Sequence, residues 1–215
     1  MEAREISIPA GAVSLKGDLV VPVAARGVVL FAHGSGSSRH SPRNQVVAQR
    51  LQEAGLATLL MDLLTVREEE EDERTARLRF DMGLLGRRLI AALDWLAEDE
   101  RIRDLPVGCF GASSGAGGAL VAAAERPESI KAVVSRGGRP DLAGDALPRV
   151  QAPTLLLVGS RDEAVIEMNR QALERLRCVK FVIVPGASHL FEEPGTLDVV
   201  AKLAAAWFIR YATTG

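Results

Sequence analysis

The sequence predicts a doubly wound α/β fold with a mostly parallel sheet. Three observations predict this class: short apolar runs alternate with helical patterns, the runs are rich in Val, Leu and Ile, and Gly, Pro or Asp bound most of them. The chain has 215 residues, of which 47% are hydrophobic and 25% charged, as is typical of globular proteins. We expect a single domain over residues 1–215.

The first 26 residues predict an antiparallel hairpin. Ile6 and Ile8 are separated from the segment 15–23 by the turn-forming residues Pro9-Ala-Gly11. Six later runs predict buried parallel strands at 28–32, 56–61, 107–110, 130–135, 154–158 and 179–184. Helical patterns occupy 42–54, 81–97, 114–125, 163–177 and 195–211. Ligand sites of such a sheet lie beyond the carboxyl ends of its strands.

The acidic run at 68–73 precedes the second helical pattern. We interpret it as a solvated loop running into a helix start, where acidic side chains favour the positive end of the helix dipole. A mobile lid over the functional site is the alternative.

Charge and cysteine content exclude several classes of partner and cofactor. There are 26 Lys and Arg against 28 Asp and Glu, and no broadly basic stretch, so we expect no nucleic acid partner. Cys109 and Cys178 are too few for a disulfide framework. The sequence lacks a leader pattern, a long apolar run and a metal-ligand motif, so we expect a cytoplasmic protein that binds no membrane, metal or cofactor. Assembly as a homodimer stays open.

The loop after the strand at 107–110 contains the G-x-S-x-G pattern as Gly111-Ala-Ser113-Ser-Gly115. A strand precedes the pattern and a helix follows it, which is the context that lifts a serine above a sheet on a sharp turn. Small neighbours are needed because the turn leaves no room for side chains. The alternative is that these residues only let a helix approach a strand closely.

Two later loops supply the partners that a serine nucleophile needs. Asp162 follows the strand at 154–158 and His189 follows the strand at 179–184. Taken singly, Asp162 suits a helix N-cap and His189 a structural or solvated histidine. Together with Ser113 they give the chain order serine, acid, histidine. Ser113 would then attack an acyl carbon, His189 would take its proton, and Asp162 would orient the imidazole.

A tetrahedral intermediate also needs hydrogen-bond donors for its oxyanion. We expect one from the backbone N–H of Ser114, which opens the helix after the motif. The second should come from the loop after residues 28–32, with the Ser35 N–H as first choice and the Gly36 N–H as fallback. We expect His33 to brace this loop.

These motifs, with the leading hairpin, resemble the α/β-hydrolase superfamily, and more narrowly its small dienelactone-hydrolase-like branch. The resemblance covers nearly the whole chain and rests on His33-Gly34-Ser35-Gly36, on the G-x-S-x-G motif, and on Asp162 and His189. It implies an α/β-hydrolase fold. Dienelactone hydrolases proper use a cysteine as nucleophile where this chain has Ser113, so the sequence departs from that pattern.

The pocket is expected to be open, because only about fifteen residues separate the strands at 130–135 and 154–158 and leave no room for a large cap domain. We expect substrate contacts from Gly34, Gly36, Arg39 and Arg136. Several guanidinium groups near this edge, including Arg43 and Arg139, suit an anionic substrate. The alternative is that a chain with 22 Arg and four Lys has Arg in most of its loops.

The sequence as a whole predicts a serine hydrolase for small carboxylic esters or thioesters, with lactones and amides left open. Three alternatives remain. Gly34-Ser-Gly36 with Asp62 suits a dinucleotide-binding protein, although Arg39 takes the place of the third glycine. The same triad could transfer the acyl group to an acceptor other than water, and the fold could serve as a non-catalytic binding protein.

Overall fold

The computed structural model describes residues 3–214, and its eight strands form one sheet in the order β1-β2-β4-β3-β5-β6-β7-β8. Strands β3 to β8 are parallel, while β2 pairs antiparallel with both β1 and β4. The strands are β1 (Arg4–Ala10), β2 (Val13–Val20), β3 (Val28–Ala32), β4 (Ala57–Met61), β5 (Val107–Ala112), β6 (Ile130–Arg136), β7 (Thr154–Gly159) and β8 (Val179–Val184). The predicted hairpin and parallel sheet are therefore confirmed.

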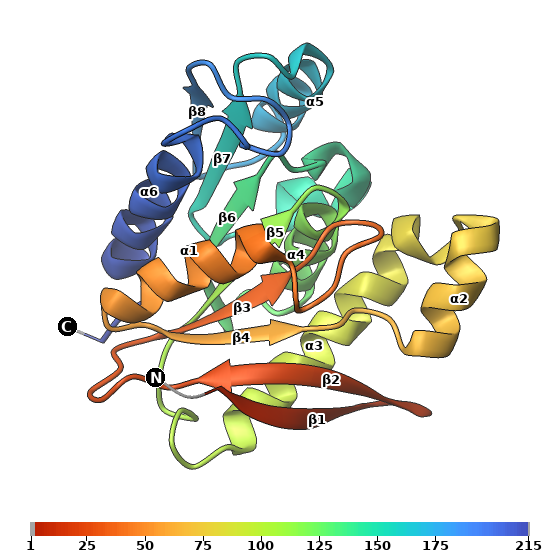
Figure 1. Ribbon diagram of the computed structural model, residues 1–215, viewed down its shortest axis with the longest axis vertical. Helices are drawn as coiled ribbons and strands as arrows, with labels where there is room; N and C mark the ends of the chain where they lie inside the picture. Colours follow the sequence, from red (N-terminus) through yellow and green to blue (C-terminus); the bar gives the residue numbers. More distant parts are fainter. Residues whose placement is uncertain (1–2, 215) are drawn as a thin grey trace.

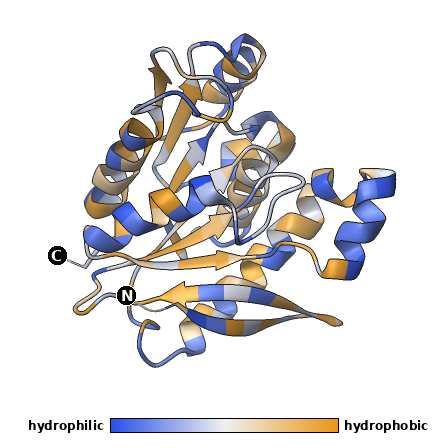
Figure 2. Ribbon diagram, viewed as in Figure 1, coloured by the Kyte–Doolittle hydropathy of each residue, from blue (hydrophilic) through white to orange (hydrophobic). Residues whose placement is uncertain are grey.

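Helices cover both faces of the sheet (Figure 1). One face packs on α1 (Pro42–Glu53) and α6 (Thr196–Tyr211). The other packs on α3 (Met82–Glu98), α4 (Ser114–Glu125) and α5 (Glu163–Leu173). The interior strands β3, β4 and β7 are buried along their whole length, because both of their faces carry helices. Figure 2 shows these strands as mostly hydrophobic ribbon between amphipathic helices.

The connections are short, and no large cap domain interrupts residues 3–214. The β6–β7 connection holds only the 3₁₀ segment η2 (Pro140–Arg149), and the β4–α3 connection holds α2 (Val66–Thr75) and the 3₁₀ turn η1 (Leu78–Phe80). Within the same span, even the longest helices fall short of the length and apolar character that a bilayer crossing requires.

Helix α2 corrects the interpretation of the acidic run as a solvated loop. Residues 68–73 lie inside α2, which begins with a capping box between Thr65 and Glu68. Two of the acids are fixed by partners: Glu68 pairs with Arg88 of α3 at 2.7 Å, and the buried Asp72 pairs with Arg79 at 2.6 Å. The remaining acids keep α2 hydrophilic (Figure 2).

Candidate active site

Ser113 occupies a strained turn between β5 and α4. Its backbone has φ 50° and ψ −124°, a conformation that a non-glycine residue rarely adopts. Side chains could not fit on either side: a Cβ on Gly111 would lie 2.4 Å from the Ala116 Cα, and one on Gly115 would lie 2.4 Å from the Ala32 oxygen. The turn therefore has the strand, elbow and helix that the G-x-S-x-G motif predicts.

Asp162 and His189 come together from the ends of two neighbouring strands. Asp162 follows β7, His189 follows β8, and the His189 Nδ1 lies 2.5 Å from an Asp162 carboxylate oxygen. An Nδ1–H that donates to this carboxylate leaves Nε2 as the proton acceptor of the ring. Asp162 precedes α5, but its side chain makes no hydrogen bond that caps this described helix, so the N-cap alternative is wrong.

Ser113 and His189 line the same cavity, which has a volume of about 350 Å³. Its wall is predominantly polar, and three of the four predicted substrate contacts, Gly34, Gly36 and Arg136, belong to it. The other lining residues are Ser35, Ser37, Ser41, Arg43, Asn44, Ala112 and Leu190. The serine, the histidine and a set of polar groups therefore surround one hollow at the carboxyl edge of the sheet.

The loop after β3 packs directly on the elbow. A Cβ on Gly34 would lie 3.0 Å from the Ser113 Cβ, so a side chain would be crowded here. The Ser35 N–H donates to the Ser114 Oγ at 3.1 Å, and the two hydroxyls lie 2.8 Å apart. The predicted oxyanion donors, Ser35 and Ser114, thus lie next to each other, with the Ser35 N–H already bonded to a hydroxyl.

His33 fixes this loop through both ring nitrogens. Its Nδ1 lies 2.9 Å from the Gly34 carbonyl oxygen, and its Nε2 accepts from the Leu63 N–H at 3.0 Å. These partners require a neutral ring with the proton on Nδ1. Burial lowers the pKa of His33, which favours the same form. The side chain therefore tethers the loop to the segment after β4, in agreement with the predicted bracing role.

The structure separates the predicted arginines into two groups. Arg136 and Arg43 line the cavity, whereas Arg39 and Arg139 do not belong to its wall. Arg39 contacts three acids: its backbone N–H and its guanidinium bond to Asp62, and the guanidinium also pairs with Asp18 and Glu5 at 3.2 Å. Arg139 pairs with Asp141 at 2.7 Å.

Ser41 and Asn44, at the start of α1, are residues of the site that the sequence analysis missed, although it had placed Arg43 near this edge. The Ser41 hydroxyl caps α1 by accepting from the Asn44 N–H at 3.4 Å, and both residues line the cavity. A signal was available, because Ser41-Pro42 is a typical N-cap followed by proline at the first helical position. A helix that follows a parallel strand begins at the same edge of the sheet as the loops that carry Ser113, Asp162 and His189.

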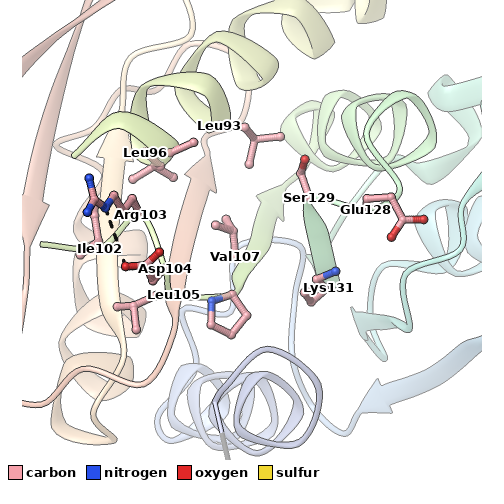
Figure 3. Close-up of a pocket in the computed structure, with 12 residues that line it drawn as sticks. Leu93, Leu96, Ile102, Arg103, Asp104, Leu105, Val107, Glu128, Ser129 and Lys131 are labelled. Atoms are coloured by element: carbon pink, nitrogen blue, oxygen red, sulfur yellow. Dashed lines mark ion pairs between the residues drawn. The ribbon is translucent and has the colours of Figure 1, made fainter. Parts of the chain in front are cut away.

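A second cavity, of about 360 Å³, lies at the opposite end of the sheet (Figure 3). It is lined by Val107 and Lys131, which stand near the amino ends of β5 and β6, and by leucines of α3. Its charged groups include the ion pair between Arg103 and Asp104, whose nearest atoms are 3.7 Å apart. Unlike this second cavity, the hollow next to Ser113 is lined by a serine on a strained turn and by a histidine that pairs with Asp162.

Comparisons with known proteins agree with this geometry. The model of the dienelactone hydrolase family matches residues 15–210. A crystal structure of a dienelactone hydrolase from Anabaena variabilis is 61% identical, covers 99% of this chain and 100% of its own, and superposes with a TM-score of 0.95. Est1E from Butyrivibrio proteoclasticus, at 17% identity, covers 96% of this chain and 98% of its own with a TM-score of 0.79, and so shares the fold.

A curated relative is much longer than this chain. The protein named "Putative phosphoribosyl transferase" from Mycobacterium tuberculosis strain H37Rv is 57% identical over 210 residues, which is 97% of this chain and 46% of the relative. This chain thus spans less than half the length of that protein. The family model and the similar Anabaena structure each cover most of the chain, which therefore belongs to the dienelactone hydrolase family of α/β hydrolases.

Proposed function

We propose that the chain is a serine hydrolase that cleaves small carboxylic esters or thioesters through an acyl-enzyme intermediate. One observation supports this most: Ser113, on its strained elbow, lines the same cavity as His189, and the His189 Nδ1 lies 2.5 Å from the Asp162 carboxylate. Nucleophile, base and orienting acid are the three groups that such chemistry requires.

In the proposed reaction, the Ser113 Oγ attacks the acyl carbon while the His189 Nε2 takes the hydroxyl proton. The imidazolium, stabilised by Asp162, then gives that proton to the departing alcohol or thiol as the bond to it breaks. A water molecule, deprotonated by His189, attacks the acyl-serine in the second half. The acid product leaves, and the proton returns to Ser113.

The tetrahedral intermediates would be stabilised by backbone donors beside the elbow. The Ser114 N–H belongs to the first residue of α4, where the helix dipole favours negative charge. The Ser35 N–H donates to the Ser114 Oγ in the free protein, and an oxyanion would replace that hydroxyl as its acceptor. The Gly36 N–H is the alternative second donor.

The relatives' names support hydrolysis more than they specify a substrate. The similar Anabaena protein is called a dienelactone hydrolase, so a lactone is a natural member of a test panel. A serine nucleophile suits open esters and lactones alike, because both present an acyl carbon with an alkoxide leaving group. The transferase name belongs to a protein more than twice as long as this chain.

The proposal is tested by release of nitrophenolate from 4-nitrophenyl acetate and butyrate. We expect the wild type to hydrolyse at least one of them, and Ser113→Ala to lose activity by at least about a thousandfold. Ser129→Ala changes an exposed serine far from the Ser113 cavity, at the opposite end of the sheet; it is the matched control and should retain full activity. Comparable turnover by Ser113→Ala would refute the proposal.

A further inference from the structure

Arg136 is a buried cation that forms no ion pair with any acid among residues 3–214. It is the last residue of β6 and is 8% exposed. Its Nη2 lies at 3.5 Å from the Asn44 Oδ1, while its Nε and Nη1 are buried and have no hydrogen-bond partner within the part of the chain that the structure describes. Burial, together with the charge of Arg43, lowers the pKa of Arg136 to about 10. Burying such a charge is costly unless something neutralises it.

The N-terminus of α1 meets the same cavity. Ser41, Arg43 and Asn44 stand at the N-cap and in the first turn of this 12-residue helix, and all three line the cavity together with Arg136. The dipole and the free N–H groups of a helix N-terminus attract anions. In α1, Pro42 has no N–H and the Asn44 N–H donates to the Ser41 Oγ, so the dipole and the Arg43 N–H remain for a ligand. Arg43 adds a second positive charge, although it also pairs with Glu192 at 2.5 Å. The N-terminus of α1 and the buried guanidinium of Arg136 thus both favour an anionic ligand.

The described residues that line the cavity include no acidic side chain, so none of them neutralises Arg136 from inside the hollow. Sheet register fixes Arg136 beside the elbow, because it is the partner of Ala112 in the β5–β6 ladder. The Ser113 N–H also donates to the Arg136 carbonyl oxygen at 3.2 Å. An anion at this place could therefore belong to the same small molecule as an acyl group at Ser113.

We propose that Arg136 and the N-terminus of α1 form an anion subsite that binds a carboxylate or phosphate group of the substrate. The subsite deepens the proposed function and rests on it, since the bound molecule is the ester cleaved at Ser113. An oxyanion would accept from the Arg136 guanidinium and from the Arg43 N–H, and it would lie near the positive end of the α1 dipole. The preferred substrate is then an anionic ester, not a neutral one.

The first test compares two esters that differ in one charge. Mono-4-nitrophenyl adipate carries a free carboxylate, and its methyl-capped counterpart carries none. In Arg136→Met we expect kcat/KM for the anionic ester to fall by roughly tenfold to a hundredfold, as for loss of a hydrogen bond to a charged group. The capped ester should change less than about threefold. Arg126→Met, at an exposed position beyond the end of α4, should change neither.

Folding of the variant is measured separately. Since the charge of Arg136 is uncompensated in the free protein, the melting temperature of Arg136→Met should equal or exceed that of the wild type. Arg136→Lys keeps the charge without the planar fork and should give an intermediate preference for the anionic ester. The anion subsite would be overturned if a folded Arg136→Met protein lost kcat/KM equally on both esters. It would also be overturned if neither kcat/KM changed.

The second test does not depend on turnover. Calorimetric titration of Ser113→Ala with inorganic phosphate and with adipate should show binding of at least one, and the tighter of the two identifies the anion class. Binding should be lost in Ser113→Ala/Arg136→Met. If the wild type hydrolyses no ester but this Arg136-dependent binding is present, the subsite stands and the hydrolase proposal fails. Absence of binding to Ser113→Ala would overturn the subsite.

Discussion

At the scale of single residues, His33 decides how the loop beside Ser113 is held. The neutral ring donates from Nδ1 to the Gly34 carbonyl and accepts at Nε2 from the Leu63 N–H. A protonated ring could no longer accept from Leu63, and the loop would lose its tether to the segment after β4. The state of this histidine is therefore coupled to the geometry of the predicted oxyanion donors.

The lowered pKa of His33 gives a pH dependence of stability with a definite sign. Burial holds the folded value below the ordinary 6.5, so the unfolded chain binds the proton more readily. The stabilisation by neutral His33 is complete above pH 6.5 and is lost as the pH falls below it, at up to about 1.4 kcal/mol per pH unit.

His33→Gln tests this dependence, because the amide supplies a donor and an acceptor without titrating. We expect the free energy of unfolding of His33→Gln, measured with denaturant between pH 7 and 5, to fall less steeply than that of the wild type. His40→Gln, at an exposed histidine, should keep the wild-type slope. If the free energy of unfolding fell with the same slope against pH in all three proteins, the assigned role of His33 would be contradicted.

At the scale of elements, α2 is a charged helix that its partners hold in place. It buries one residue, Asp72, whose carboxylate accepts from the N–H groups of Leu78 and Arg79 and from the Arg79 guanidinium. Apolar periodicity is the main sequence signal for a helix, and this run of acids has none. The capping box at Thr65 and Glu68 was the available signal, and it explains why 68–73 forms a helix and not a loop.

Asp72→Ala should therefore destabilise the protein. The substitution leaves two backbone N–H groups and a guanidinium without their acceptor, which costs about 1 to 3 kcal/mol in the free energy of unfolding. Glu71→Ala removes an exposed acid from the same helix and should stay within about 0.5 kcal/mol of the wild type. Equal effects in urea unfolding would show that Asp72 does not anchor α2.

At the scale of the whole molecule, the sequence predicts the elements better than their arrangement. Every predicted parallel strand is present with ends shifted by two residues at most, because buried strands are short apolar runs with clear boundaries. The order of strands across the sheet depends on which face and which neighbouring strand each connecting helix packs against. The apolar pattern does not contain that information. The structure supplies it as β1-β2-β4-β3-β5-β6-β7-β8.

The same limit applies to the candidate site. Ser113, Asp162 and His189 could be predicted, because each follows its own strand and the carboxyl ends of parallel strands share an edge. The approach of Arg136 to Asn44 could not, since these residues are 92 positions apart and meet only through sheet register and the start of α1. The loop positions of Arg39 and Arg136, each after a parallel strand, gave equal reason to expect both in the pocket, and the structure separates them.

The central claim is that Ser113 is an activated nucleophile, and intact-mass analysis after treatment with a fluorophosphonate tests it most directly. This probe reacts with an activated serine whatever the natural substrate is. The account predicts one adduct on the wild type, mapped to Ser113, and none on Ser113→Ala. A folded wild type without an adduct, or an adduct that persists in Ser113→Ala, would contradict it.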